Sequence, residues 1–148
     1  MINSSTTEVK HVSDIIQVIN SGIDFYRDAK EKVESPQLAS FFDRMIRARQ
    51  AVKQQLQPYA VAQQGEIEQG SAFTVEARKV YTKVIASMSS DKDHTYISQL
   101  EEVEDKTLEE IRSALAEEQP AGCEVALRSA MTTMQQCHSE MRALKLAS

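Results

Sequence analysis

Residues 12–38, VSDIIQVINSGIDFYRDAKEKVESPQL, are the part of the chain that most directly indicates its fold. Their apolar face consists of Val12, Ile15, Ile16, Ile19, Ile23, Tyr26 and Val33. Intervals of three and four residues place these side chains on one side of an α-helix. The segment Glu34-Ser35-Pro36 then ends this helix and begins another, because Ser is a favoured N-cap and Pro is accepted at the first helical position. So short a link makes the two helices antiparallel neighbours.

Helical patterns continue on both sides of this hairpin. We expect the first helix to run from about Glu8 to Val33, with N-cap candidates in residues 4–7, and the second from about Pro36 to Ala62. The polar residues 63–70, which include two Gly, are the best linker in the chain. Three more helices are predicted after the linker, over about residues 71–88, 91–118 and 122–146.

Composition agrees with an all-α protein. The chain has 148 residues with only four Gly, three Pro and no Trp, which leaves few residues for the tight turns of a β protein. This length is usual for one domain, so we expect a single domain over 1–148 with a disordered start at 1–7. Four long helices predict a four-helix bundle, and the additional helix at about 71–88 would form a long crossover between the second and third. Such a crossover is the connectivity of ferritin-like folds.

Charge and hydropathy argue against several classes of function. The formal net charge is −5 and the basic residues are spread along the helices, so no nucleic-acid-binding surface is indicated. No apolar stretch approaches the ~20 residues that span a bilayer, and residues 1–7 are polar, unlike a secretory signal. We therefore expect no nucleic acid and no membrane as partners, and a cytoplasmic location.

Both cysteines are predicted on the last helix. Cys123 and Cys137 are 14 residues apart, or about 21 Å along a helix, which is too far for a disulfide between them. We expect them to be reduced core residues, in keeping with a reducing compartment.

Two charged residues fall inside the predicted apolar faces. Arg49 lies between Met45 and Val52 on the second helix, and Glu104 lies at the centre of the face of the 91–118 helix. A buried charge is costly unless it is paired, so each residue predicts the other as a partner in the middle of the bundle. Gly22 of the first helix would leave room in the same layer. The alternative is that either side chain extends sideways to reach water.

Two further polar residues are possible members of the core. His138 lies on a core face about one turn from the Arg49–Glu104 layer, where a single His is more often a structural residue than a ligand. Tyr26 is expected to be a core aromatic whose hydroxyl bonds to a neighbour. The remainder of the run 101–105, EEVED, is interpreted as a solvated face.

Several stretches together resemble an uncharacterised bacterial family of ferritin-like four-helix-bundle proteins, known as a domain of unknown function. The resemblance covers roughly Val12 to Leu144, and it implies a ferritin-like fold with no established activity. The similar stretches are Gly22-Ile23-Asp24-Phe25-Tyr26-Arg27-Asp28-Ala29, Ser35-Pro36-Gln37-Leu38, and Glu101-Glu102-Val103-Glu104-Asp105 with Leu108, followed by His138, Arg142 and Leu144.

The metal ligands of the wider ferritin-like superfamily are incomplete in this sequence. Those bundles bind two metals with a Glu from each of two helices and Glu-x-x-His from each of the other two. Here the second helix has Arg49 where a Glu is needed, and Gln135 precedes His138 by three positions. Only Glu104 and His138 remain, and the cation at Arg49 would repel a metal. We therefore predict no metal site, cofactor or catalytic residue.

Three functions are compatible with these observations. The first is a non-catalytic, stress-associated or accessory interaction protein that forms a homodimer or another self-association, for which Tyr81 and Ile85 offer a contact surface. The second is a metal-binding protein or oxidoreductase whose metal site has fewer ligands than the ferritin type and lies near Glu104 and His138. The third is a carrier of a small ligand in an interior rich in adaptable methionines. We prefer the first.

Overall fold

The computed structural model describes residues 7–71, Lys83 and 91–148, and these residues contain four α-helices and no strand. The helices are α1 (Val12–Lys32), α2 (Pro36–Gln64), α4 (Lys92–Leu115) and α5 (Ala121–Ala147). The all-α prediction is confirmed. None of these helices, as described, has the length and apolar character needed to cross a membrane.

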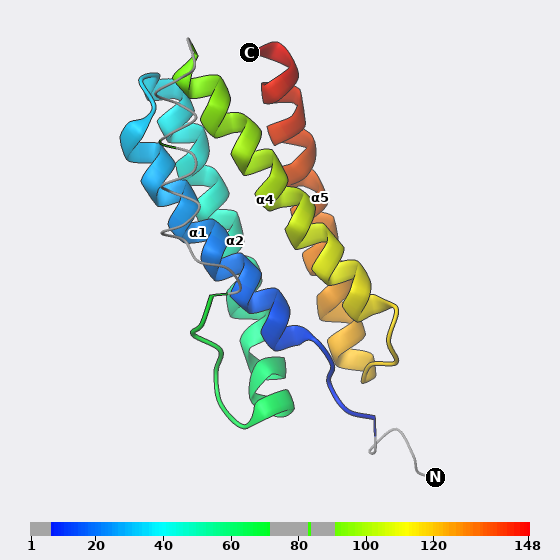
Figure 1. Cartoon of the computed structure of the whole chain (residues 1–148). Helices are drawn as coiled ribbons and strands as arrows, with labels where there is room; N and C mark the ends of the chain where they lie inside the picture. Colours follow the sequence, from blue (N-terminus) through cyan, green and yellow to red (C-terminus); the bar gives the residue numbers. More distant parts are fainter. Residues whose placement is uncertain (1–6, 72–82, 84–90) are drawn as a thin grey trace.

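The four helices lie side by side as two antiparallel hairpins (Figure 1). Besides the contacts within each hairpin, α1 packs against α4 and α2 packs against α5. In Figure 1, α2 and α4 run in the same direction, so the end of α2 and the start of α4 lie at opposite ends of the bundle. Every pair of helices in contact is therefore antiparallel.

The first hairpin has the expected turn. The Ser35 hydroxyl accepts a hydrogen bond from the N–H of Leu38, and Pro36 is the first residue of α2. Asp93, at the start of α4, accepts hydrogen bonds from the N–H groups of Glu34 and Ser35. One carboxylate of the second hairpin thus holds the turn of the first.

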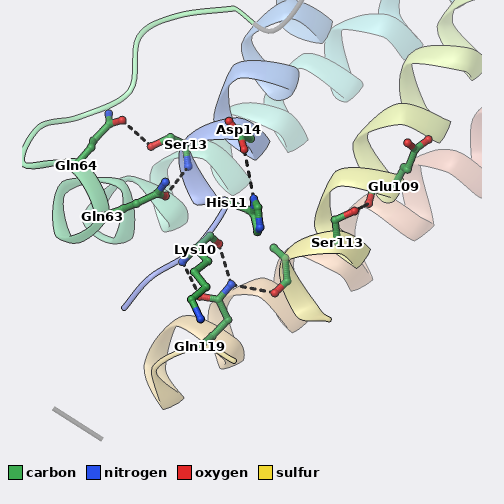
Figure 2. A network of polar contacts seen from close by, with 10 residues as sticks. Lys10, His11, Ser13, Asp14, Gln63, Gln64, Glu109, Ser113 and Gln119 are labelled. Carbon is green, nitrogen blue, oxygen red and sulfur yellow. Dashed lines mark hydrogen bonds and ion pairs between the residues drawn. The ribbon is translucent and has the colours of Figure 1, made fainter. Parts of the chain in front are cut away.

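Helix α1 begins at Val12, four residues later than predicted, and its N-cap is His11 rather than a residue in 4–7. His11 has a φ of 66°, which turns the chain sharply before the helix. Among the described residues next to α1 in the sequence, no side chain caps the helix. Instead, Gln63 Oε1 accepts from Ser13 N–H at 3.0 Å, and Gln64 Oε1 accepts from the Ser13 hydroxyl at 2.8 Å (Figure 2).

These contacts also correct the end of α2. Gln63 and Gln64 were expected to open a linker over 63–70, but both are still helical, and α2 ends where Gly65 adopts a φ of 90°. Pro58 lies inside the helix without ending it. The two extra residues carry the amide groups that reach α1.

The other boundaries differ by a few residues. Asp91 caps α4 by accepting from the N–H of His94, and α4 ends at Leu115, three residues before the predicted end. The predicted crossover helix at about 71–88 falls almost entirely outside the described residues, as do residues 1–6 of the segment expected to be disordered. Tyr81 and Ile85 lie there too.

The core is built from the apolar faces of all four helices, which bury Ile15, Ile19, Phe42, Leu56, Leu100, Ile111, Leu127 and Met134 among others. However, the largest fully buried side chain in the described part of the chain is Arg49. The middle of the bundle therefore contains a charge that the surrounding side chains must neutralise.

Candidate functional site

A buried ion pair joins α2 to α4 in the middle of the bundle. Arg49 Nη2 lies 3.1 Å from Glu104 Oε2, and both side chains are 0% exposed. The structure thus brings together the two charged residues that interrupt apolar faces in the sequence. Neither side chain reaches water in the way that the alternative interpretation required.

Two hydroxyl groups complete this cluster. The Tyr26 hydroxyl of α1 donates to Glu104 Oε2 at 2.6 Å. Thr107 Oγ1 accepts from Arg49 Nη2 at 2.9 Å and donates to the backbone carbonyl of Val103, also at 2.9 Å. Arg49, Glu104, Tyr26 and Thr107 are called the middle cluster below. Three helices contribute to it, so it links α1, α2 and α4.

Gly22 makes room for the guanidinium group. A Cβ atom added at Gly22 would lie 2.6 Å from Arg49 Cζ and closer still to Nη1, which no real Cβ contact tolerates. The guanidinium also lies near the Tyr26 ring, with Cζ 5.6 Å from the ring centroid. Helix α1 is therefore shaped to receive the arginine of α2.

Burial and the ion pair set the electrostatics of the cluster. Burial, followed by the nearby Glu104 carboxylate, raises the pKa of Tyr26 well above its usual value, so the hydroxyl remains a donor. Burial alone would lower the pKa of Arg49, but Glu104 and Tyr26 raise it, so the guanidinium stays charged. Burial and Glu104 also raise the pKa of the Cys137 thiol to about 12. The cluster contains a permanent cation and no reactive nucleophile.

The hydrogen bonding of the middle cluster is incomplete. Within the described part of the chain, Arg49 Nε and Nη1 and Glu104 Oε1 are buried without a hydrogen-bond partner. Unpaired buried polar atoms are costly, and a buried ion pair is weak evidence for stability as such. We interpret the ion pair as a source of specificity, because a single charged layer favours one register of α2 relative to α4 across the bundle.

His138 is not part of this cluster. Its side chain is 21% exposed, and its Nε2 lies 2.5 Å from Asp105 Oδ1 on the outer side of α4. The expected position on a core face is therefore corrected to the edge between α4 and α5. Glu104 and His138, the two ligands of the alternative metal site with fewer ligands, do not contact each other.

Thr107 and Glu101 are among the buried polar residues that sequence reasoning missed. The position of Thr107, one helical turn after Glu104, is the feature of the sequence that could have indicated its burial. Glu101 was interpreted as solvated, but its side chain is 9% exposed and contacts Lys145 at 2.8 Å and Arg142 at 3.5 Å. Those cations come from α5, so no local pattern around Glu101 reveals them.

The remaining donor groups do not assemble a metal centre. Among the described residues, no group of three or more His, Cys, Asp and Glu side chains could hold a metal ion. Glu104, the one carboxylate retained from the ferritin-type pattern, has Arg49 as its neighbour instead.

Comparison with protein families gives a match over most of the chain. Residues 7–117 match the model of a family described as a domain of unknown function (DUF2383). The chain belongs to this family. The DUF2383 match includes α1, α2 and α4, and with them the whole middle cluster, whereas α5 lies beyond it. His138, Arg142 and Leu144, which carried the C-terminal part of the resemblance, are thus outside the matched region. No curated protein and no solved structure matches the chain.

Proposed function

We propose that this DUF2383 protein is a ferritin-like helical bundle in which an ion pair replaces the metal centre, and that it is a non-catalytic accessory protein acting through interactions in the cytoplasm. One observation carries the proposal. A fully buried guanidinium, that of Arg49, lies 3.1 Å from the only carboxylate of the middle layer that matches the ferritin-type pattern.

The order of the helices supports the ferritin-like assignment. Helices α2 and α4 run parallel, and α1 and α5 run opposite to them (Figure 1). A bundle made of two hairpins in this order requires one long connection, between α2 and α4, as ferritin-like bundles do. In this chain 27 residues separate Gln64 from Lys92, counting residues 65–91.

Charge supports the absence of metal chemistry in the middle layer. A divalent cation bound to Glu104 would lie within a few ångströms of the Arg49 guanidinium, in an interior where charges interact strongly. It would also compete with the Tyr26 hydroxyl, which already donates to Glu104 Oε2. The guanidinium neutralises the carboxylate without the further ligands that a metal requires.

The chemistry of the cluster also argues against catalysis. Its polar groups are closed off from water, including those of Arg49 and Glu104 that lack a partner, and the pKa of the nearby Cys137 is too high for a thiolate at neutral pH. The alternative, a metal site with fewer ligands that uses Glu104 and His138, would need the two side chains to converge. His138 instead contacts Asp105 at the edge of the bundle.

Metal analysis tests this proposal. The purified protein is analysed for bound metals, and its thermal unfolding is followed with and without added Fe²⁺ or Zn²⁺. We expect only traces of metal and an unchanged melting temperature, since a ligand present at 100 times its Kd would add ~2.7 kcal/mol of stability. Stoichiometric metal, or a clear rise in melting temperature, would contradict the proposal.

A matched pair of variants locates any metal that binds. His138→Ala removes the histidine at the edge, whereas Glu104→Gln alters the middle layer. Binding lost only in His138→Ala would assign the metal to the edge and leave the middle layer as proposed. Binding lost in Glu104→Gln would show that the middle layer is a metal site.

A further inference from the structure

A shallow groove runs between α2 and α5 on the outside of the bundle. It encloses about 460 Å³, and its lining is mainly apolar. Met45 and Cys137 form its floor, and Ala48 and Thr132 provide small side chains beside them. The two helices pack less extensively on each other than the helices of either hairpin do. The groove is therefore an apolar strip that no described segment covers.

Opposite charges lie on the two rims of the groove. Arg44 projects from α2 and Glu140 from α5. Because the helices are antiparallel, the first groove residue of α2 and the last of α5 are at the same end of the groove.

Neither rim charge is neutralised. Arg44 lies over the Phe41 ring, with Cζ 5.3 Å from the centroid, and Glu140 Oε2 has a 3.5 Å contact with Gln136 Nε2. Within the described part of the chain, neither makes an ion pair.

This placement fits a two-fold partner. A two-fold axis parallel to the groove leaves the position of every residue along the groove unchanged and exchanges its two rims. Helix α2 of one copy then faces α5 of the other. Arg44 would then face Glu140 of the partner subunit, and Glu140 would face the partner's Arg44. An axis across the groove would bring Arg44 to the opposite, uncharged end. The surface is thus complementary in charge to itself in one orientation.

We propose that a second copy of this chain occupies the groove between α2 and α5, as a two-fold dimer with its axis along the groove and two reciprocal ion pairs between Arg44 and Glu140. The apolar floor is buried at the centre and the charges lie at the margin, which is the usual distribution in an interface. The inference rests on the proposed interaction role and names the partner as the chain itself.

Charge reversal tests the pairing. The mass of the full chain is measured by light scattering over a dilution series. We expect a mass of two chains for the natural sequence and at least a ~10-fold weaker dimer for Arg44→Glu and for Glu140→Arg, because each creates two like-charge contacts. The double variant Arg44→Glu/Glu140→Arg restores opposite charges and should restore the dimer.

A control variant separates the pairing from net charge. Arg112→Glu makes the same change of charge as Arg44→Glu, at an exposed position of α4 that does not line the groove. It should leave the dimer unchanged, and circular dichroism should show that every variant is folded.

The proposal would be overturned by a monomeric natural chain, by oligomers larger than two, by single variants that dimerise normally, or by a double variant that stays monomeric. A monomer without metal would remove this inference and leave the metal-free bundle intact. A dimer with metal in its middle layer would support this inference and contradict the metal-free bundle.

Discussion

In the middle of the bundle, Arg49 and Glu104 are charged and wholly buried, whereas at the end where α1 begins the side chains that bridge distant segments are uncharged glutamines. There, Gln119 Nε2 donates to the carbonyls of Lys10 and Ala114, and its Oε1 accepts from the N–H of Lys10 (Figure 2). Both regions join segments that are distant in sequence. They differ in charge and in access to water.

That difference determines what each region contributes. A charge left alone in the interior has no substitute partner, so the middle cluster is costly to break and excludes other arrangements of the helices. A backbone group left alone at a half-buried end can bond to water, so the glutamines adjust local geometry at a small cost. We therefore expect global effects from the middle and local effects from the end.

The largest effect is expected for Glu104→Leu. It leaves the Arg49 guanidinium buried without a counter-charge, which should lower the free energy of unfolding by about 3–5 kcal/mol. Urea denaturation measures this, with Glu109→Leu on the exposed side of α4 as the control, expected to change stability by less than ~0.5 kcal/mol. Equal effects of the two substitutions would mean that the charge of Glu104 is not needed inside the bundle.

Gly22→Ala should come next. Alanine is favoured over glycine inside a helix by about 1 kcal/mol, but here its Cβ would overlap the Arg49 guanidinium. We expect a net loss of about 1–3 kcal/mol from overpacking. In an Arg49→Met background the same substitution should cost much less. A stabilising Gly22→Ala in the natural sequence would refute the packing of arginine against Gly22.

The two thiols extend the comparison to alkaline pH. Burial raises the pKa of Cys137, near the middle cluster, to about 12 and that of Cys123, at the end, to about 11. In the unfolded chain thiols ionise near pH 8.5, so the unfolded state binds fewer protons above that pH, and stability falls as pH rises towards 11–12.

By pH ~10 each thiol should account for about 1.4–2 kcal/mol of lost stability relative to neutral pH. Urea denaturation of Cys123→Ala and Cys137→Ala across this range should show a shallower decline with pH than the natural sequence. An unchanged decline in both variants would mean that the thiols ionise as readily in the folded protein as in the unfolded chain.

The smallest effect is expected for Gln119→Ala. Water can replace its bonds to Lys10 and Ala114, so the free energy of unfolding should fall by about 1 kcal/mol. Hydrogen exchange of the Lys10 amide should become faster while the core amides of α4 are unaffected. Gln55→Ala, on an exposed face of α2, serves as the control. A loss of stability as large as that of Glu104→Leu would mean that the middle cluster and the end where α1 begins contribute equally to stability.

The features predictable from the sequence are those with a local cause. Ser35 and Pro36 form a turn by their own chemistry, and the structure has that turn where it was expected. Arg49 and Glu104 stood out because each interrupts an apolar face, and the cost of burying a charge links one to the other. Gly22 followed from the need for space in the same layer.

The features that were missed have distant causes. The start of α1 depends on Gln63 and Gln64, which are some fifty residues away in sequence. Glu101 is buried beside cations from α5, which are some forty residues away in sequence. Thr107 resembles a surface residue, since a helical threonine can bond its own backbone, and only the position of Arg49 gives it a second role.

The double-mutant cycle of Arg49→Met and Glu104→Leu tests the central claim most directly. Each single variant leaves a buried charge without its partner, whereas the double variant removes both charges and leaves only the Tyr26 hydroxyl without its acceptor. We predict that urea denaturation will show a coupling of about 1–3 kcal/mol, with the double variant more stable than the sum of the single losses implies. Losses that add to within about 0.5 kcal/mol would show that the two residues do not act as a pair.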